Sequence, residues 1–266
     1  YLGVQLRASG SLFNVLSDGF ISVNFGMFAL TTIVVIYVAS GGLRSVAYVD
    51  CAQAVLLAIG IAILGGVSLY YTGGWSGFTT GLAKIVNSDI ASGQNLTPDG
   101  YSMKIAIPGS IQMVSAGSKA TGGAWTGIMC MTYMFALMGI QSSPAFSMWA
   151  LANKTPQDFR WQQVIASSLI VGILLFTFTI FQGLGAQILV DNGILNNITD
   201  KNLVPELINL LSTSAPWLVG LLAVCALAAM QSTGSAYMST FSAMVTRDIY
   251  AKYILPEASD NSQKNI

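Results

Sequence analysis

Residues 46–71 read VAYVDCAQAVLLAIGIAILGGVSLYY. Apart from one aspartate near its start, this stretch has no charged residue, and it exceeds the roughly 20 apolar residues that a helix needs to cross a bilayer. Five further stretches have this character or nearly so, at residues 1–16, 21–40, 124–150, 161–190 and 216–246. The short alternating segments of an outer-membrane barrel do not occur. We therefore predict an all-α membrane protein with six transmembrane helices.

The composition also indicates that lipid is the solvent for much of the chain. Only 8% of the 266 residues are charged, whereas about 25% is usual in a soluble domain. Basic and acidic residues balance, so no binding of nucleic acid is expected. The chain has no histidine, and its three cysteines (Cys51, Cys130 and Cys225) are widely spaced in apolar runs. These features argue against a disulfide framework, a zinc site and an enzyme.

Two polar connections, residues 72–122 and 191–215, separate the predicted helices, and residues 251–266 form a polar tail after a membrane domain at 1–250. The second connection includes a short amphipathic piece, Leu203 to Leu211. Basic residues in the short connections indicate the orientation. They are Arg44, Lys154, Arg160, Arg247 and Lys252. We expect that side to be cytoplasmic, both polar connections to be external, and the protein to lie in the inner (plasma) membrane.

The stretch at 216–246 contains a possible cation site. Ala229, Ser232 and Thr233 are spaced i, i+3 and i+4, so they share one face of a helix. Two hydroxyls and a carbonyl are hard oxygen ligands, which suit a small alkali cation. The alternative is that both hydroxyls bond the carbonyl one turn back, as they often do in membrane helices. Ser235 is expected to lie off this face and to serve as a control.

A broken helix is predicted at Gly139 to Pro144. Proline removes a backbone donor and disfavours a helical residue before it. Gln141, Ser142 and Ser143 lie in the same stretch. Polar breaks at membrane depth face protein or a water-filled cavity, and transporters build solute sites from them. The alternative is a kink that only packs against neighbouring helices.

Two further polar groups lie within apolar stretches. Asp50, three residues before Gln53, could attract a cation that is leaving the protein, or it could cap the start of its helix. In the first stretch, Tyr1 and Gln5 share a face, and Arg7 is expected to extend its charge toward the membrane surface. The chain starts at Tyr1 within this expected helix, so we expect it to be truncated at the N-terminus.

Several short motifs resemble the sodium:solute symporter family, in order and in spacing. They are ASGSLF at 8–13, YVASGGLRS at 37–45, YVDCAQ at 48–53, AAMQST at 228–233 and VTRDIY at 245–250. The resemblance covers nearly the whole chain except the 72–122 connection. It implies a LeuT-type fold of two inverted five-helix repeats. This chain would be a partial bundle with the third to fifth helices of the first repeat and the first three of the second.

The resemblance also implies roles for the polar residues. The Ala229 carbonyl and the Ser232 and Thr233 hydroxyls would be half of the family's sodium site. Asp50 would be the aspartate on the sodium release route, and Tyr1 an aromatic residue of the solute site. Residues 141–144 would face the solute. The protein would then be a secondary active transporter with Na⁺ as coupling ion, importing an amino acid or carboxylate by alternating access.

Departures from the family patterns bear on the solute. Sugar-transporting members carry an Asn/Asp-Gln pair and then Gln-Arg at the break, where this chain has Ser143-Pro144 and Met148-Trp149. Proline-type members carry a tryptophan before Gly-Gln-Pro, where this chain has Ala136 and then Ser142-Ser143-Pro144. The chain is nearer the small-solute type than the sugar type. An alternative function is the membrane sensor domain of a transporter-like histidine kinase.

Overall fold

The structure is a computed structural model of the chain. It describes residues 2–94, 96, 102–105, 126–140, 142–152, 155–196, 202–257, 259 and 262–263. The α-helices are α1 Leu2–Leu16, α2 Val23–Tyr71, α3 Gly74–Ser92, α4 Gly127–Ile140, α5 Pro144–Ala152, α6 Pro156–Ile165, α7 Phe176–Asp191, α8 Leu203–Asn209 and α9 Pro216–Met244. Two wider, π-type segments, η1 Ala166–Leu175 and η2 Val245–Ile254, continue α6 and α9. The predicted all-helical class is confirmed for the described residues, whose only bridge joins Leu96 to Ser102.

Four of the described helical segments are long and apolar enough to cross a membrane: Val23–Gly42, Arg44–Tyr71, Ser168–Asp191 and Pro216–Ile254. The predicted count of six is not confirmed. The first stretch forms α1, which has only 15 residues, and the stretch at 124–150 is divided between α4 and α5. The inverted-repeat architecture stays a prediction.

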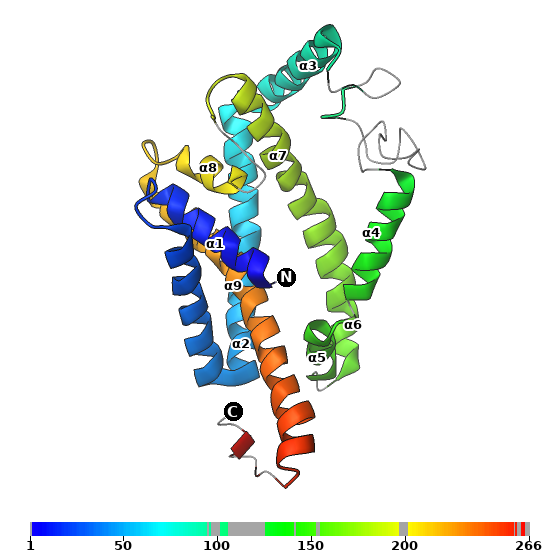
Figure 1. Cartoon of the computed structure of the whole chain (residues 1–266). Helices are drawn as coiled ribbons and strands as arrows, with labels where there is room; N and C mark the ends of the chain where they lie inside the picture. Colours follow the sequence, from blue (N-terminus) through cyan, green and yellow to red (C-terminus); the bar gives the residue numbers. More distant parts are fainter. Residues whose placement is uncertain are drawn as a thin grey trace.

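The stretches predicted at 21–40 and 46–71 form one helix, α2, that folds back on itself. Gly42 has φ 59° and ψ −166°, a combination that is essentially restricted to glycine. The arms on either side, Val23–Gly42 and Arg44–Tyr71, run in opposite directions (Figure 1). The Gly-Gly dipeptide seen in the sequence therefore forms the turn of a helical hairpin.

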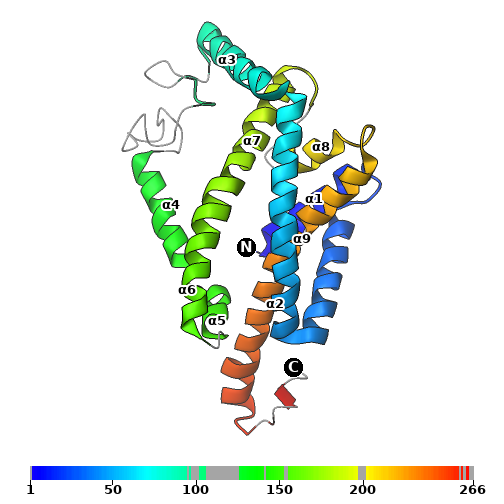
Figure 2. The same ribbon diagram turned by 180° about the vertical axis from the view of Figure 1, so that it is seen from behind.

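The second arm of α2 lies in the middle of the bundle. It packs against α9 and α7, while α1 lies across the first arm of α2 and α9 (Figures 1 and 2). A Cβ at Gly60 would lie 2.5 Å from the Cβ of Cys225, so α2 and α9 approach each other at a point where only glycine fits. Small residues permit this kind of close contact between membrane helices.

The two polar connections contain helices of their own. Residues 72–122 include α3, whose buried Phe78 and Ile85 pack against Ile188 of α7, so the part of this connection at 74–92 is a helix that its polar composition did not suggest. The amphipathic piece expected in the second connection is confirmed as α8. The kink of α2, helix α5 and the start of α6 lie toward one end of the molecule, and α3 lies at the other (Figure 1).

Within the described part of the chain, two side-chain hydrogen bonds join α2 to α7. The Ser68 hydroxyl donates to the Phe181 carbonyl at 2.8 Å, and Gln182 Nε2 donates to the Ile61 carbonyl at 2.9 Å. The backbones are close here, since a Cβ at Gly65 would lie 2.6 Å from the carbonyl oxygen of Phe178. The second arm of α2 and α7 therefore form one closely packed pair.

This close approach predicts a position-specific loss of stability. Replacing Gly65 by valine should force α2 and α7 apart and cost roughly 1–3 kcal/mol. Gly66→Val is the matched control, because a Cβ at Gly66 meets nothing within 4 Å. Thermal unfolding of the detergent-solubilised variants should show a lower midpoint for Gly65→Val only. Equal midpoints would contradict the packing of these two helices.

Candidate functional site: oxygen ligands between α2 and α9

Three oxygens, from residues one helical turn apart, come together on one face of α9. The Ser232 hydroxyl donates to the Ala229 carbonyl at 3.1 Å, and the Thr233 hydroxyl lies 3.4 Å from the same oxygen. These are the local bonds that the packing alternative predicted. They also bring all three predicted ligand oxygens to one point, where each hydroxyl keeps lone pairs for another partner. The geometry is compatible with both interpretations.

Asp50 and Ser235 connect the second arm of α2 to α9. The fully buried Ser235 hydroxyl lies 3.0 Å from Asp50 Oδ1 and 2.8 Å from the Ser232 carbonyl. Its single proton is shared between these two acceptors, so Ser235 links the carboxylate to the backbone of the proposed cation site. Ser235 therefore cannot serve as the independent control that was expected, because it contacts the Ser232 backbone and Asp50. Asp50 itself lies two turns into the second arm of α2, where its side chain binds Ser235 instead of capping the backbone.

Two more polar groups of α2 are buried near this link, and neither has a hydrogen-bond partner among the described residues. The Tyr37 hydroxyl, on the first arm, lies beside Ser235 and Asp50. Gln53 is 7% exposed, and its Oε1 is unpaired. Leaving such atoms unpaired is costly, which is typical of places where a ligand or a second conformation supplies the partner. Neither of the two described ion pairs involves Asp50.

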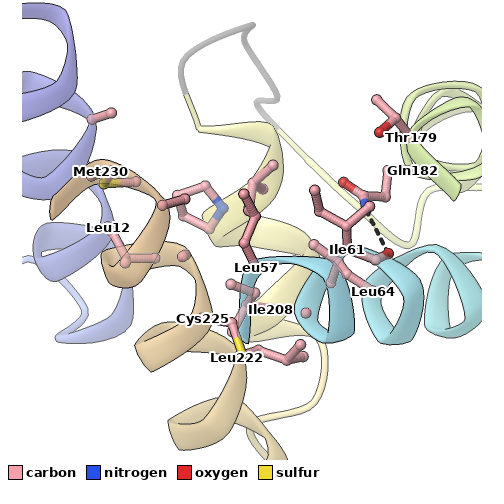
Figure 3. Close-up of a pocket in the computed structure, with 16 residues that line it drawn as sticks. Leu12, Leu57, Ile61, Leu64, Thr179, Gln182, Ile208, Leu222, Cys225 and Met230 are labelled. Carbon is pink, nitrogen blue, oxygen red and sulfur yellow. Dashed lines mark hydrogen bonds between the residues drawn. The ribbon is translucent and has the colours of Figure 1, made fainter. Parts of the chain in front are cut away.

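A cavity of about 400 Å³ adjoins this site (Figure 3). Helices α1, α2, α7, α8 and α9 line it, and most of the lining side chains are apolar. Ala229 lines the cavity and is also the acceptor for Ser232 and Thr233. The proposed cation ligands therefore adjoin the cavity through Ala229, and Ser235 connects their helix to the carboxylate of Asp50.

The residues predicted to contact the solute are not all brought to this cavity. Tyr1 and Gln141 lie outside the described residues. Gln5 is half-buried, one turn before Ala8, which lines the cavity. The other two, Ser142 and Ser143, do not line it.

The predicted break is confirmed, because α4 ends at Ile140 and α5 begins at Pro144. Ser142 is exposed, contrary to the expectation that it faces protein, while the Ser143 hydroxyl is buried and unpaired among the described residues. Helix α5 contacts α9 through Met148 and Thr240.

Sequence reasoning missed two polar residues of this region. Ser235 follows the predicted ligands closely, and its buried contact with Asp50 depends on a second helix. Gln182 of α7 lines the cavity, is 6% exposed and binds the Ile61 carbonyl. The available signal was a glutamine inside an apolar stretch, which is costly in a bilayer unless it is used.

Apolar helices that surround a cavity, with hydroxyl and carbonyl oxygens and a carboxylate beside it, are typical of a membrane transport protein. A sequence profile of the sodium:solute symporter family matches residues 1–266, and the chain belongs to this family. Membership implies sodium-coupled solute symport, with Na⁺, a solute and the lipid bilayer as partners. No solved structure matches the chain.

Proposed function

We propose that this protein imports a small organic solute, an amino acid or a carboxylate, across the plasma membrane, coupled to sodium by alternating access. One observation supports this most directly. Ala229 lines the cavity, its carbonyl gathers the hydroxyls of Ser232 and Thr233, and Ser235 links the same helix to Asp50. A cation at Ala229 would face the cavity, and Asp50, which Ser235 joins to the same helix, would supply a negative charge nearby.

The chemistry of these groups suits a sodium ion that has lost its water. Hydroxyl and carbonyl oxygens are hard ligands that replace water without adding charge. The remaining ligands would come from elsewhere in the protein. Asp50, on the second arm of α2, offers a negative charge beside Ser235 of α9. This charge favours movement of the cation out of the site toward the cytoplasm. The break at residues 141–144 is proposed as a second solute contact, together with Tyr1 and Gln5.

The driving force is sufficient for uphill import. Moving one positive charge down about 100 mV releases roughly 2.3 kcal/mol, which supports a solute gradient on the order of fortyfold at about 1.4 kcal/mol per tenfold ratio. Coupling requires that sodium and solute favour the same conformation, since a ligand with equal affinity for both states shifts nothing. The contact of Ala229 with the cavity supplies a route for this coupling.

Uptake by the full-length protein in proteoliposomes tests the proposal. Radiolabelled amino acids and small carboxylates should accumulate when sodium is present outside and potassium inside, and accumulation should stop when a sodium ionophore dissipates the gradient. Accumulation that is the same in a choline gradient would contradict sodium coupling.

The orientation predicts which residues can be labelled from outside. The α2 kink with Arg44 and the η2 segment with Lys252 lie toward the same end, opposite α3 (Figure 1). In a background with all three native cysteines replaced by serine, Asn87→Cys should react with an impermeant maleimide on intact cells. Lys252→Cys should react only after permeabilisation. Both side chains are exposed, so accessibility differs only by membrane side; the reverse pattern would invert the topology.

A further inference from the structure

The cavity contains a hydrogen-bond acceptor whose orientation is fixed by the protein. Gln182 extends from α7, and its Nε2 donates to the Ile61 carbonyl at 2.9 Å (Figure 3). A peptide carbonyl can only accept, so the amide nitrogen must face Ile61 and the amide oxygen must face away from it. Among the described residues, none donates to Gln182 Oε1, although Gln182 is only 6% exposed. The cavity wall therefore presents a carbonyl oxygen that can accept a hydrogen bond from a ligand.

The second polar side chain of the lining also offers an acceptor. Thr179 lies one turn before Gln182, and its hydroxyl donates to the Leu175 carbonyl at 2.7 Å. Its proton is used there, so only its lone pairs remain for a ligand. The cavity thus has two acceptors along the same side of α7.

The rest of the lining is apolar and uncharged. Its members are Ala8, Leu12, Leu57, Gly60, Ile61, Leu64, Val204, Pro205, Ile208, Leu222, Cys225, Ala226, Ala229 and Met230. A carboxylate placed against Gln182 and Thr179 would face two acceptors and no donor, which is costly, so a carboxylate of the ligand would have to lie away from this side of α7. A donor group facing Gln182 would satisfy both partners, and an aliphatic body would fill the remaining space.

We infer that this cavity binds the transported solute, and that the solute has an aliphatic body and an amino or hydroxyl group that donates to Gln182 Oε1. The inference rests on the proposed function and narrows its solute from amino acid or carboxylate to the amino type. A volume of about 400 Å³ lies within the roughly 300–1,000 Å³ range of small-molecule sites. This inferred solute site is distinct from the proposed contacts at Ser142 and Ser143, which do not line the cavity.

Protection of Cys225 from thiol modification tests where the ligand binds. The Cys225 side chain lines the cavity, and Cys51→Ser with Cys130→Ser leaves it as the single thiol of this chain. Methyl methanethiosulfonate would be applied to the full-length protein in sodium buffer, with leucine, leucinol or 4-methylpentanoate as probes. These probes share an aliphatic body; leucinol keeps the amino group without the carboxylate, and 4-methylpentanoate keeps only the carboxylate. Leucine and leucinol should slow modification by about tenfold at nine-tenths occupancy, and 4-methylpentanoate should not.

Two variants distinguish recognition of the ligand by Gln182 from the hydrogen bond by which Gln182 joins α7 to Ile61 of α2. Gln182→Leu removes the acceptor, so the leucinol concentration that gives half-maximal protection should rise at least about tenfold. Ser68→Ala is the matched control, because it removes the other side-chain bond described between α2 and α7 without changing the cavity lining. Protection should persist in Ser68→Ala. Equal loss in both variants would show that Gln182 only holds the helices together, and would overturn the inference.

The comparison of probes stands even if Gln182→Leu fails to fold. Equal protection by 4-methylpentanoate and leucinol would overturn the inference about the solute. No protection by leucine and leucinol would overturn it as well. Because protection reports binding and needs no ion gradient, it is measured separately from sodium-driven uptake. Sodium-driven uptake without protection of Cys225 would refute the cavity site alone, and protection without sodium-driven uptake would refute the symporter proposal alone.

Discussion

Replacing Ser232 or Thr233 by alanine should raise the sodium concentration for half-maximal uptake by about ten- to hundredfold. Each hydroxyl is directed at the Ala229 carbonyl and is partly buried, so its loss leaves a dehydrated cation one ligand short. The apolar surroundings cannot replace that ligand. A lost interaction with a charged group costs roughly 1.5–3 kcal/mol, which corresponds to this change in affinity. Sodium titrations of uptake at saturating solute measure the effect.

Two controls distinguish a cation ligand from a packing role. Thr233→Ser keeps the oxygen and should retain most of the sodium affinity. Thr177→Ala removes the same kind of bond to the carbonyl four residues back, on α7 and away from the cavity lining, and should leave sodium dependence unchanged. Unaltered sodium dependence in both alanine variants, with normal amounts of protein in the membrane, would leave only the helix-packing interpretation.

Asp50→Asn should weaken sodium affinity by a similar factor while leaving the fold intact. The amide oxygen can still accept from Ser235, so the contact at 3.0 Å is retained and only the charge is lost. If the cation lies at roughly twice the contact distance of about 4 Å from the carboxylate, one negative charge stabilises it by roughly 2 kcal/mol at an effective dielectric constant near about 20. That corresponds to about a thirtyfold rise in the sodium concentration for half-maximal uptake.

The control for this charge is Asp248→Asn. Asp248 lies on η2 at the end of the same long helix, and its side chain is exposed, so its charge is screened by solvent. Its replacement should not change the sodium titration. If Asp50→Asn lowers the unfolding midpoint but leaves the sodium titration unchanged, the carboxylate serves only to join α2 to α9.

The elements that follow from local chemistry were predictable from the sequence. The apolar lengths of the two α2 arms, the glycine turn between them and the break before Pro144 each depend on neighbouring residues in the chain. The helix α3 was not predicted, because its exposed face is polar and only Phe78, Ile85 and Asp89 are buried. An amphipathic helix outside the membrane lacks the long apolar run by which membrane helices are recognised.

The spacing of Ala229, Ser232 and Thr233 also determined by itself that their oxygens meet, because helix geometry sets which residues share a face. Only the tertiary structure decided what lies opposite them. Ser235 meets Asp50 across 185 residues, and Gln182 meets Ile61 across 121. Lipid-facing and protein-facing sides of these helices are equally apolar, so hydropathy does not specify the pairing. Close contacts between helices specify the pairing, such as that of Gly60 with Cys225, because small residues let particular helix faces come together.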